Sequence, residues 1–593
     1  MRVGDAPEAG RVVSVLETRE HILLTVLGTN PIAASYTLDG RCAESRFAPV
    51  ALLNLLQDEA RPDRVIALCT PEAKRESWPL LQEELRSTAC AVERVAVPSG
   101  YTQASVNEYL LAVCKRVSER GSVDLTVDLT HGFRHFSFLA YTAVLYLEAL
   151  GIARVRGAHY GVFGGPGDQP NTFFDLRPLL ELPRWVYALR VLRDTGSALP
   201  LAEALATGSD HPSIRQLDKC LKDLSKAYHS GLPLELGRHA RDILRQSLRP
   251  LGRRLSGDHR LPLTNELVRR FEDTLRKFAL PDDPVAGGGW KAKVELSRGE
   301  LTRQGAIIDD LLQRGSIATA LGMMDEWTVS WAVWRLESGA GWLDFHGSRG
   351  RAASLLGAIG AVYRDSELKV LLSDEQCRLG KFWNGLSETR NAYAHHGMRK
   401  QDLLGQQTAL QERRITEVWG ELKMFPDWSL TFGDVGERVL VSPVGRRPGV
   451  LFSALEACRA AADDAEPTIC LAICSPETEV LVEQAANHAR FAGRIEAVRI
   501  DPHGGHGEIQ AAVKAGRRHL VGADDVFVNV TGGTTVMGLA AEALAAEARR
   551  FARPVRRFGL IDRRPPAEQD ADPYQVGEPF WLDGEGAEDA DAN

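Results

Sequence analysis

Runs of apolar residues near the start of the chain predict buried β-strands that alternate with helices. Residues 21–27, 64–69 and 123–129 form these runs, and each is closed by a polar or glycine-containing turn. Helical patterns fill the gaps, and residues 136–150 read as a long apolar helix that ends at Gly151. This alternation is typical of a doubly wound parallel sheet. We therefore predict a Rossmann-like α/β domain over residues 18–180.

The middle of the chain shows the period of helices instead. Runs rich in β-formers stop after Leu182, and residues 213–228, 239–248 and 265–278 show helical periodicity. We expect an all-α region over residues 181–430. Three tryptophans, Trp327, Trp331 and Trp334, fall on one helical face, which could stack nucleobases. An ordinary aromatic core face is the favoured interpretation.

The strand pattern returns in the last third of the chain. Residues 439–444, 468–474 and 525–530 are apolar runs, and a helix rich in Ala and Glu follows at 536–549. They predict a second Rossmann-like domain over residues 436–583, which repeats the plan of the first. The amino-acid sequences of the two predicted domains are not similar enough to indicate a sequence duplication. The acidic, Ala-rich tail at 584–593 is predicted to be disordered.

Composition narrows the classes of function. A length of 593 residues suggests three or four domains. The net charge of −8 argues against a broad nucleic-acid-binding surface, so a nuclease would need a local basic groove. The nine cysteines are scattered without a CxxC pair, which fits a reducing cytoplasm. With no long apolar run and no signal-like pattern in residues 1–20, we expect a cytoplasmic protein without a membrane span.

One stretch carries candidate chemistry: Glu-Thr-Arg-Asn-Ala-Tyr-Ala-His-His at residues 388–396. It lies late in a predicted helix over residues 375–393, which we expect Gly397 to cap. Asn391 and His395 share a helical face, whereas Arg390 and His395 lie about 140° apart around the axis. One helix therefore does not bring Arg390 and His395 onto one atom. We expect a composite site in a homodimer, where two copies of the helix meet.

These residue types allow RNA cleavage without a metal ion. His395 can take or give a proton at neutral pH, and the Arg390 guanidinium can hold a phosphate. Asn391 would orient His395 or the phosphate, and the 2′-OH of the RNA would be the nucleophile. His396 could replace His395 as the base.

The spacing alone is weak evidence for a catalytic site. Arg-x4-His occurs also at Arg154/His159 and at Arg254/His259, and an Arg and a His on a solvated helix end would look the same. Only Arg390/His395 has Asn directly after the Arg and lies late in a long predicted helix.

Two turns of the first predicted sheet could bind an anion. Gly28, Thr29 and Asn30 follow one strand, and residues 130–134 follow another, where the helix that begins there favours a negative charge. Neither turn has the GxGxxG or the Walker pattern, so no nucleotide cofactor is indicated. A tight strand–helix turn without a ligand remains the alternative.

Asp128-Leu-Thr130-His131-Gly132, followed by Phe-Arg, matches Asp-x-Thr-His-Gly. With the Gly-Thr-Asn turn before it and the Arg-Asn…His helix after it, the chain resembles the CARF–HEPN ribonucleases of type III CRISPR systems over residues 22–424. The resemblance implies that a CARF domain binds cyclic oligoadenylate and that a HEPN domain cleaves single-stranded RNA. The ligand residues that it implies are Gly28, Thr29, Asn30, Thr130, His131, Gly132 and Arg134.

The last domain carries a second such turn. Thr-Gly-Gly-Thr at 531–534 resembles the ligand loop of other CARF domains, with Thr535 where these often have Lys. The implied ligand residues are Ser475, Thr478, Thr531, Gly532, Gly533 and Thr534. A role in dimerisation alone is the alternative. His503, His506 and Glu508 could form a metal cluster, but their Gly-rich setting favours a flexible loop, and no metal is expected.

Together these features predict an endoribonuclease of antiviral defence that cyclic oligoadenylate activates. Two alternatives stay open: a non-catalytic sensor of the cyclic nucleotide, and an enzyme that degrades it.

Overall fold

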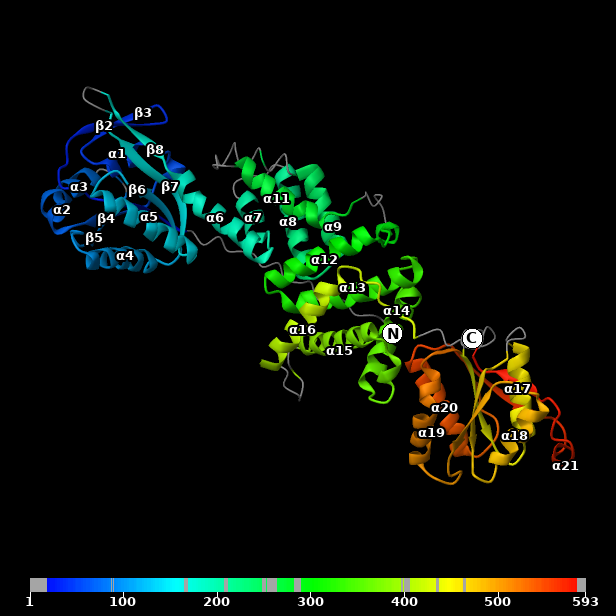
Figure 1. Cartoon of the computed structure of the whole chain (residues 1–593). Helices are drawn as coiled ribbons and strands as arrows, with labels where there is room; N and C mark the ends of the chain where they lie inside the picture. Colours follow the sequence, from blue (N-terminus) through cyan, green and yellow to red (C-terminus); the bar gives the residue numbers. More distant parts are fainter. Residues whose placement is uncertain are drawn as a thin grey trace, which may run out of the picture. The chain divides into compact units, whose positions relative to one another are not determined.

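The computed structural model divides into two compact units, whose elements are labelled in Figure 1. One unit comprises residues 1–221 and 247–269, and the other comprises 222–246 and 270–593. The structure describes residues 19–583 except for 87, 89, 165–168, 207–211, 248–251, 253–263, 282–288, 396–397, 399–405, 433–436 and 462–465. The predicted disordered tail at 584–593 therefore lies outside the described residues.

An eight-stranded sheet forms the centre of the first unit, in the order β3-β2-β8-β7-β6-β1-β4-β5. The five strands β7, β6, β1, β4 and β5 run parallel, while β7–β8 and β2–β3 are antiparallel pairs. The strands are β1 (Glu20–Val26), β2 (Ala34–Leu38), β3 (Arg41–Ser45), β4 (Arg64–Cys69), β5 (Ala91–Ala96), β6 (Val123–Asp128), β7 (Ala153–Val162) and β8 (Asn171–Asp175).

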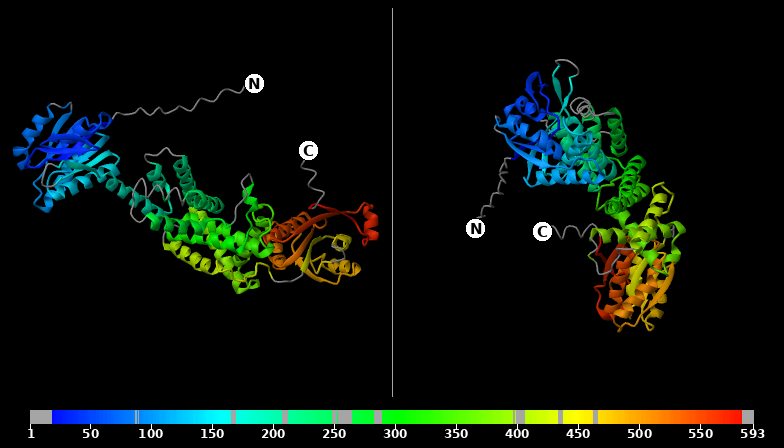
Figure 2. Two further views of the ribbon diagram at one scale, coloured as in Figure 1. Left: turned by 90° about the horizontal axis from the view of Figure 1, so that it is seen from above. Right: turned by 90° about the vertical axis from the view of Figure 1, so that its left-hand side faces the viewer.

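Helices cover both faces of this sheet (Figure 2). Successive residues of β1 enter two different cores: Ile22 packs with α4 and α5, and Leu23 packs with α1 and α3. The helices are α1 (Ala48–Leu55), α2 (Pro71–Glu76), α3 (Trp78–Leu85), α4 (Gln103–Ser118) and α5 (Arg134–Ala149). The predicted Rossmann-like fold class is confirmed, because a parallel sheet lies between two helical layers.

Between the two sheets the chain is helical, as predicted. The helices are α6 (Arg177–Thr195), α7 (Leu199–Ala206), α8 (Pro212–His229), α9 (Pro233–Asp242), α11 (Thr264–Phe278), α12 (Arg298–Gln313), α13 (Ile317–Glu337), α14 (Ser348–Arg364), α15 (Asp374–Ala394) and α16 (Gln406–Leu422). Trp327 and Trp331 of α13 are 1% and 0% exposed. The aromatic face of α13 is therefore a core face, as favoured above, and not a platform for bases.

A six-stranded sheet forms the last part of the second unit, in the order β11-β10-β9-β12-β13-β14. All neighbours are parallel except β13 and β14. The strands are β9 (Glu437–Val444), β10 (Ile469–Cys474), β11 (Arg494–Arg499), β12 (Ala523–Asn529), β13 (Val555–Ile561) and β14 (Glu578–Trp581). The flanking helices are α17 (Gly449–Ala461), α18 (Glu479–His488), α19 (His506–Leu520), α20 (Thr535–Arg550) and the short α21 (Pro566–Ala571).

The two sheets share one strand order. Strands β5-β4-β1-β6-β7-β8 of the first correspond, position by position, to β11-β10-β9-β12-β13-β14 of the second, down to the antiparallel last pair. The first sheet adds only the β2–β3 hairpin at its edge. The structure therefore contains a repeated fold, although the amino-acid sequences of the two domains do not show the repeat.

Candidate functional site

Helix α15 carries the Arg-Asn…His segment, and its start is fixed by a capping box. The Ser373 hydroxyl accepts from the Gln376 amide, and the Gln376 side chain accepts from the Ser373 amide. Gly380 lets α15 lie close against α14, because a Cβ at this position would come within 2.8 Å of Tyr363 Cβ. These contacts set the rotation of the helix, and with it the direction in which Arg390 points.

Arg390 is held by a carboxylate from another helix. Its Nη2 donates to Asp325 Oδ2 of α13 at 2.9 Å, and its Nη1 donates to Asn391 Oδ1 at 2.9 Å. The Asp325 side chain is 10% exposed and the Arg390 side chain is 41% exposed. Burial raises the pKa of Asp325, and the Arg390 guanidinium opposes that rise. One side of the guanidinium is thus anchored, while part of it stays open to a phosphate.

His395 lies at the end of α15, as its C-cap residue, with an exposed side chain. Its amide donates to Asn391 O at 3.0 Å. Within the described residues, no hydrogen bond joins Arg390 to His395, and the Asn391 side chain contacts Arg390 and not His395. His396 and the predicted cap Gly397 lie outside the described residues.

A cavity of about 660 Å³ opens beside Arg390. It is lined by residues of α13, of the α8–α9 turn and of the segment before α14, among them Met323 and Trp342, and by Arg349 of α14. Arg349 donates to Ser330 Oγ at 2.9 Å and is paired with Glu326. Tyr393 also lines the cavity, and its hydroxyl donates to Glu412 of α16 at 2.5 Å, which raises the pKa of Tyr393 to about 12. The sequence did not point to the cavity, to Arg349 or to Asp325.

The other two Arg-x4-His pairs do not form comparable sites. Arg154 and His159 both lie on β7, where His159 is 8% exposed and burial lowers its pKa. Arg254 and His259 lie outside the described residues.

The structure brings the two predicted turns of the first sheet together. Residues 28–30 follow β1 and residues 129–133 follow β6, and these two strands are neighbours. A Cβ at Gly28 would lie 3.6 Å from His131 Cβ. Arg134 is the first residue of α5, and His131 and Arg134 are partly or fully exposed. Thr29, Asn30 and Gly132 are exposed as well.

Asp128 organises the end of β6. Its Oδ2 accepts from Thr25 Oγ1 at 2.8 Å, and its Oδ1 accepts from the Thr130 amide at 3.0 Å. The Thr130 hydroxyl donates to the same carboxylate at 2.5 Å and accepts from the Gly161 amide of β7 at 2.9 Å. Gly132 has a φ of +99°, and a Cβ there would come within 2.5 Å of Val26 Cγ1. The Asp and the Gly of the motif thus build the turn, while the side chains of His131 and Arg134 stay partly or fully exposed.

The second sheet has the same network at the corresponding positions. Asn529 Oδ1 accepts from the Thr531 amide at 2.9 Å, its Nδ2 donates to Ser442 Oγ at 3.0 Å, and the Thr531 hydroxyl accepts from the Leu560 amide at 2.8 Å. Asn529 and Thr531 therefore take the places of Asp128 and Thr130.

The other predicted ligand residues of the second sheet lie at the carboxyl ends of its strands, an edge at which they differ in exposure. Ser475 and Thr478 are 4% and 7% exposed, and their hydroxyls bond to each other and to Val444 O, so they shape the turn after β10. Thr534 donates to Pro502 O at 3.0 Å. Gly532 and Gly533 have φ of +105° and +68°. Thr535 opens α20 as Arg134 opens α5, so the cation of the first sheet is missing there.

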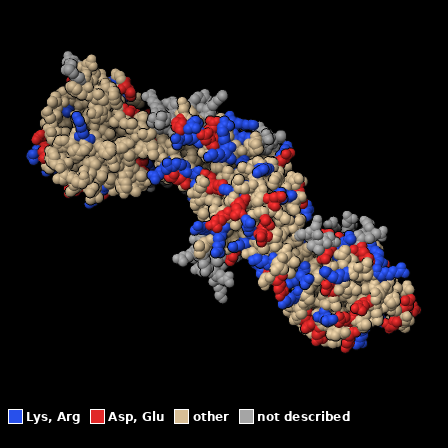
Figure 3. Space-filling view, viewed as in Figure 1, with Lys and Arg blue, Asp and Glu red and all other residues tan. Residues whose placement is uncertain are grey.

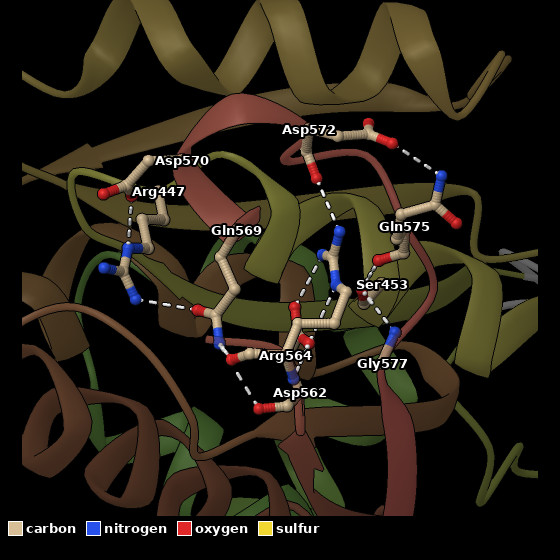
Figure 4. A network of polar contacts seen from close by, with 9 residues as sticks. All are labelled: Arg447, Ser453, Asp562, Arg564, Gln569, Asp570, Asp572, Gln575 and Gly577. Carbon is tan, nitrogen blue, oxygen red and sulfur yellow. Dashed lines mark hydrogen bonds and ion pairs between the residues drawn. The ribbon is translucent and has the colours of Figure 1, made fainter. Parts of the chain in front are cut away.

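Two arginines that the sequence did not single out lie at this edge instead. Arg447 follows β9 and Arg564 follows β13 (Figure 4). Both line a pocket of about 230 Å³ together with Thr531. Arg447 stands in the polar link before α17, at the position that Asn30 takes in the first sheet. The local sequence around Arg447 does not indicate this position, because the position is defined by the strand order, which only the fold shows.

The face drawn in Figure 3 carries no broad basic patch. In the view of Figure 3, Lys and Arg are interleaved with Asp and Glu over the helical region, and the N-terminal sheet domain shows few charged groups. In the part of the chain that the structure describes, no three His, Cys, Asp or Glu side chains gather in a way that could hold a metal ion. Of the helices described, none is long and apolar enough to cross a membrane.

No protein-family model matches the chain, and none of the curated proteins matches it significantly. Among solved structures, the chain is similar to Enterococcus italicus Csm6 bound to cyclic hexa-2'-fluoro-hexa-dAMP. The sequence identity is 11% and the TM-score is 0.34, over 69% of this chain and 95% of that chain. A similarity this low carries no argument about function, which has to rest on the sites themselves.

Proposed function

We propose that this chain is a ribonuclease that cyclic oligoadenylate activates and that cleaves single-stranded RNA without a metal ion. The observation that carries the proposal is Arg390, anchored to the buried Asp325 and partly exposed, at the end of the helix that presents His395. The resemblance of the ordered motifs to CARF–HEPN ribonucleases supports it.

The chemistry follows from these two side chains. His395 takes the proton of the RNA 2′-OH, the 2′-oxygen attacks phosphorus, and the bond to the 5′-oxygen breaks. A second imidazole gives that 5′-oxygen a proton, so the products are a 2′,3′-cyclic phosphate and a 5′-OH. Such acid–base catalysis contributes roughly 10²–10⁴-fold. Arg390 stabilises the charge that develops on the phosphate, worth roughly 3–4 kcal/mol for one preorganised donor.

Two copies of the chain complete the site in this proposal. Arg390 and His395 share no hydrogen bond within the described residues of one chain, and His395 is exposed at the helix end. Two antiparallel copies of α15 that meet at this end would bring the Arg390 of one copy near the His395 of the other. The second copy would also supply the second imidazole, so we propose a homodimer as the active form.

The activator would bind the first sheet at its carboxyl edge. The amides at the start of α5 and the Arg134 guanidinium suit a phosphate of the cyclic oligoadenylate, and His131 lies beside them. A ligand that binds the active arrangement more tightly than the resting one would shift the population toward it.

A gel assay with fluorescent RNA tests the proposal. The chain is incubated with the RNA alone, and with cyclic tetra-adenylate or cyclic hexa-adenylate, in EDTA. Cleavage that appears only with a cyclic compound supports a ligand-activated ribonuclease. An intact RNA with a bound, unchanged activator would show a non-catalytic sensor, and an intact RNA with a degraded activator would show an enzyme that acts on the cyclic nucleotide.

A further inference from the structure

The cavity beside Arg390 is large enough for a nucleobase. Its volume of about 660 Å³ lies within the roughly 300–1,000 Å³ of ordinary ligand pockets. Much of its wall is apolar, and Met323 and Trp342 in this wall are only 6% and 7% exposed. Arg390 borders the same cavity. A phosphate held by Arg390 therefore leaves the attached nucleotide beside this space.

Gln304 of α12 brings an unused hydrogen-bond acceptor to the cavity wall. The residue is 5% exposed, and its Nε2 donates to Glu300 Oε1 at 2.7 Å. A carboxylate only accepts hydrogen bonds, so the amide has to turn its nitrogen toward Glu300 and keep its oxygen free. Within the described residues, no group donates to Gln304 Oε1. Ser330, also buried in this wall, already accepts from Arg349 at 2.9 Å.

A buried ion pair holds Gln304 in this orientation. The Glu300 and Arg303 side chains are 2% and 6% exposed, and two hydrogen bonds of 2.8 and 2.6 Å join them. Arg303 Nη1 also donates to Pro233 O at 3.0 Å, and Pro233, at the start of α9, lines the cavity. The same network therefore fixes the amide of Gln304 and the start of α9. The acceptor is thus preorganised, which lowers the cost of binding a ligand to it.

An exposed aromatic ring lies at the rim of the cavity. Phe345, in the segment before α14, lines the cavity although the residue is 76% exposed. Its ring meets that of His346 edge to face, with centroids 5.5 Å apart. A ring so exposed to water contributes little to folding, whereas a base that stacks on such a ring adds to the affinity for a single strand whatever its sequence.

We propose that this cavity is the base site of the RNA substrate. Phe345 stacks on the strand at the rim, the base next to the scissile phosphate enters the cavity, and its exocyclic amine donates to Gln304 Oε1. The inference rests on the proposed ribonuclease function, because it places the RNA phosphate on Arg390. Cytosine and adenine carry such an amine, whereas uracil has a carbonyl oxygen there and would set acceptor against acceptor. Gln304 is thus a specificity-determining residue that selects an amino base over uracil.

Fluorescence anisotropy with oligonucleotides that cannot be cleaved tests the base site directly. The probes are labelled 2′-fluoro hexanucleotides of uridine, in which one central base is uracil, cytosine or pyrimidin-2-one, which is cytosine without its amine. The full chain is titrated into each probe with cyclic tetra-adenylate and, separately, with cyclic hexa-adenylate. We expect the cytosine probe to bind about tenfold more tightly than the uracil probe, as one hydrogen bond to a buried acceptor requires. The pyrimidin-2-one probe should lose this advantage.

Variants assign the preference to Gln304. Gln304→Met keeps the length of the side chain but removes the acceptor, so the cytosine and uracil probes should bind with nearly equal affinity. Gln313→Met is the matched control, because Gln313 is exposed at the end of the same helix and does not line the cavity. Phe345→Leu should weaken every probe about five- to tenfold without changing their ratio, whereas Phe345→Trp keeps a stacking ring and should bind like the unaltered chain.

Two results would overturn the inference. One is equal affinity of the unaltered chain for the three probes, which decides the matter even if Gln304→Met fails to fold. The other is a cytosine preference that Gln304→Met retains. Sedimentation of the variants tests a second copy as the occupant: a dimer that Phe345→Leu dissociates, with no base preference, would assign the cavity to an interface and also overturn the inference.

The outcome for the base site is separate from the outcome for the ribonuclease. A cytosine preference that depends on Gln304, without cleavage of RNA that has its 2′-OH groups, would contradict the proposed ribonuclease and support the base site. Cleavage of such RNA without any base preference in the anisotropy titrations would contradict the base site alone.

Discussion

Asp325 and Arg390 form a half-buried ion pair across two helices, with Oδ2 and Nη2 at 2.9 Å. The carboxylate is almost completely covered, whereas the guanidinium is 41% exposed. Asp325 Oδ1 is buried and has no hydrogen-bond partner within the described residues. The pair therefore fixes the direction of Arg390 at a cost in desolvation.

Asp325→Asn should lower RNA cleavage about 100-fold, because an arginine that swings away by about 1 Å loses its alignment with the phosphate. The melting temperature should change little, since the freed guanidinium is already partly hydrated. Single-turnover cleavage rates and thermal unfolding check both expectations.

The matched control for this prediction is Glu326→Gln, the next residue of α13, whose side chain is 71% exposed. It should retain the rate of the unaltered chain. An Asp325→Asn variant that cleaves as fast as Glu326→Gln would show that the anchor has no role in catalysis.

Ligand binding at the carboxyl ends of the strands of the first sheet should respond to the loss of the cationic side chains there. The double variant His131→Ala, Arg134→Ala should bind cyclic tetra-adenylate at least tenfold more weakly, and the remaining binding should depend less on salt. Isothermal titration at two salt concentrations measures this. Arg154→Ala, at the opposite end of β7, is the control. Unchanged activation in the double variant would place the activator elsewhere.

Gly132 should be more sensitive to a methyl group than another glycine of similar backbone. Gly132 and Gly151 have φ of +99° and +69°, but a Cβ would meet Val26 at 2.5 Å at the first and open space at the second. Positive φ costs each alanine roughly 1–3 kcal/mol. The clash should add to this for Gly132→Ala, as urea unfolding of the two variants would show. Equal losses would mean that the turn relaxes freely.

The first sheet should lose stability in mild acid. Burial lowers the pKa of His159 from its ordinary value of 6.5. At a pH between the lowered pKa of the folded chain and the ordinary pKa of 6.5, the unfolded chain binds more protons than the folded chain. The free energy of unfolding therefore falls as the pH drops below about 6.5. His159→Gln should make urea unfolding less sensitive to pH, while His135→Gln, with an exposed ring, should not. A pH dependence that survives His159→Gln unchanged would assign it to other groups, of which His21 is one.

Continuous apolar runs made the central elements predictable. The sequence predicted β4 with its observed bounds and α15 within a residue or so at either end, because these elements are buried or capped by local residues. The strands β2, β3 and β14 were not predicted. β3 and β14 lie at sheet edges and have mostly exposed residues, and β2 is a short strand in which only Tyr36 and Leu38 are buried. The predicted helix over residues 239–248 contains the end of α9 and a π-helical turn at Ile243–Ser247.

Site residues were predictable from the sequence only where they lie in a short motif. Arg390, His395 and the residues around Gly132 stand in short recognisable stretches. Asp325 lies 65 residues before Arg390 in a helix of core residues, and no local pattern marks it. Arg447 and Arg564 belong to a pocket that exists only because β9 and β13 flank β12. Such long-range partners follow from the strand order, which apolar periodicity alone does not specify.

The most direct test of the central claim is the rate at which fluorescent single-stranded RNA is cleaved by the His395→Ala variant, with saturating cyclic oligoadenylate and EDTA present. We predict that the unaltered chain and His506→Ala, which removes an exposed imidazole at the start of α19, cleave at the same rate. His395→Ala should bind the activator normally and cleave at least about 100-fold more slowly, the lower range of acid–base catalysis. Cleavage by His395→Ala at the rate of His506→Ala, or its reversible loss in EDTA for the unaltered chain, would contradict the account.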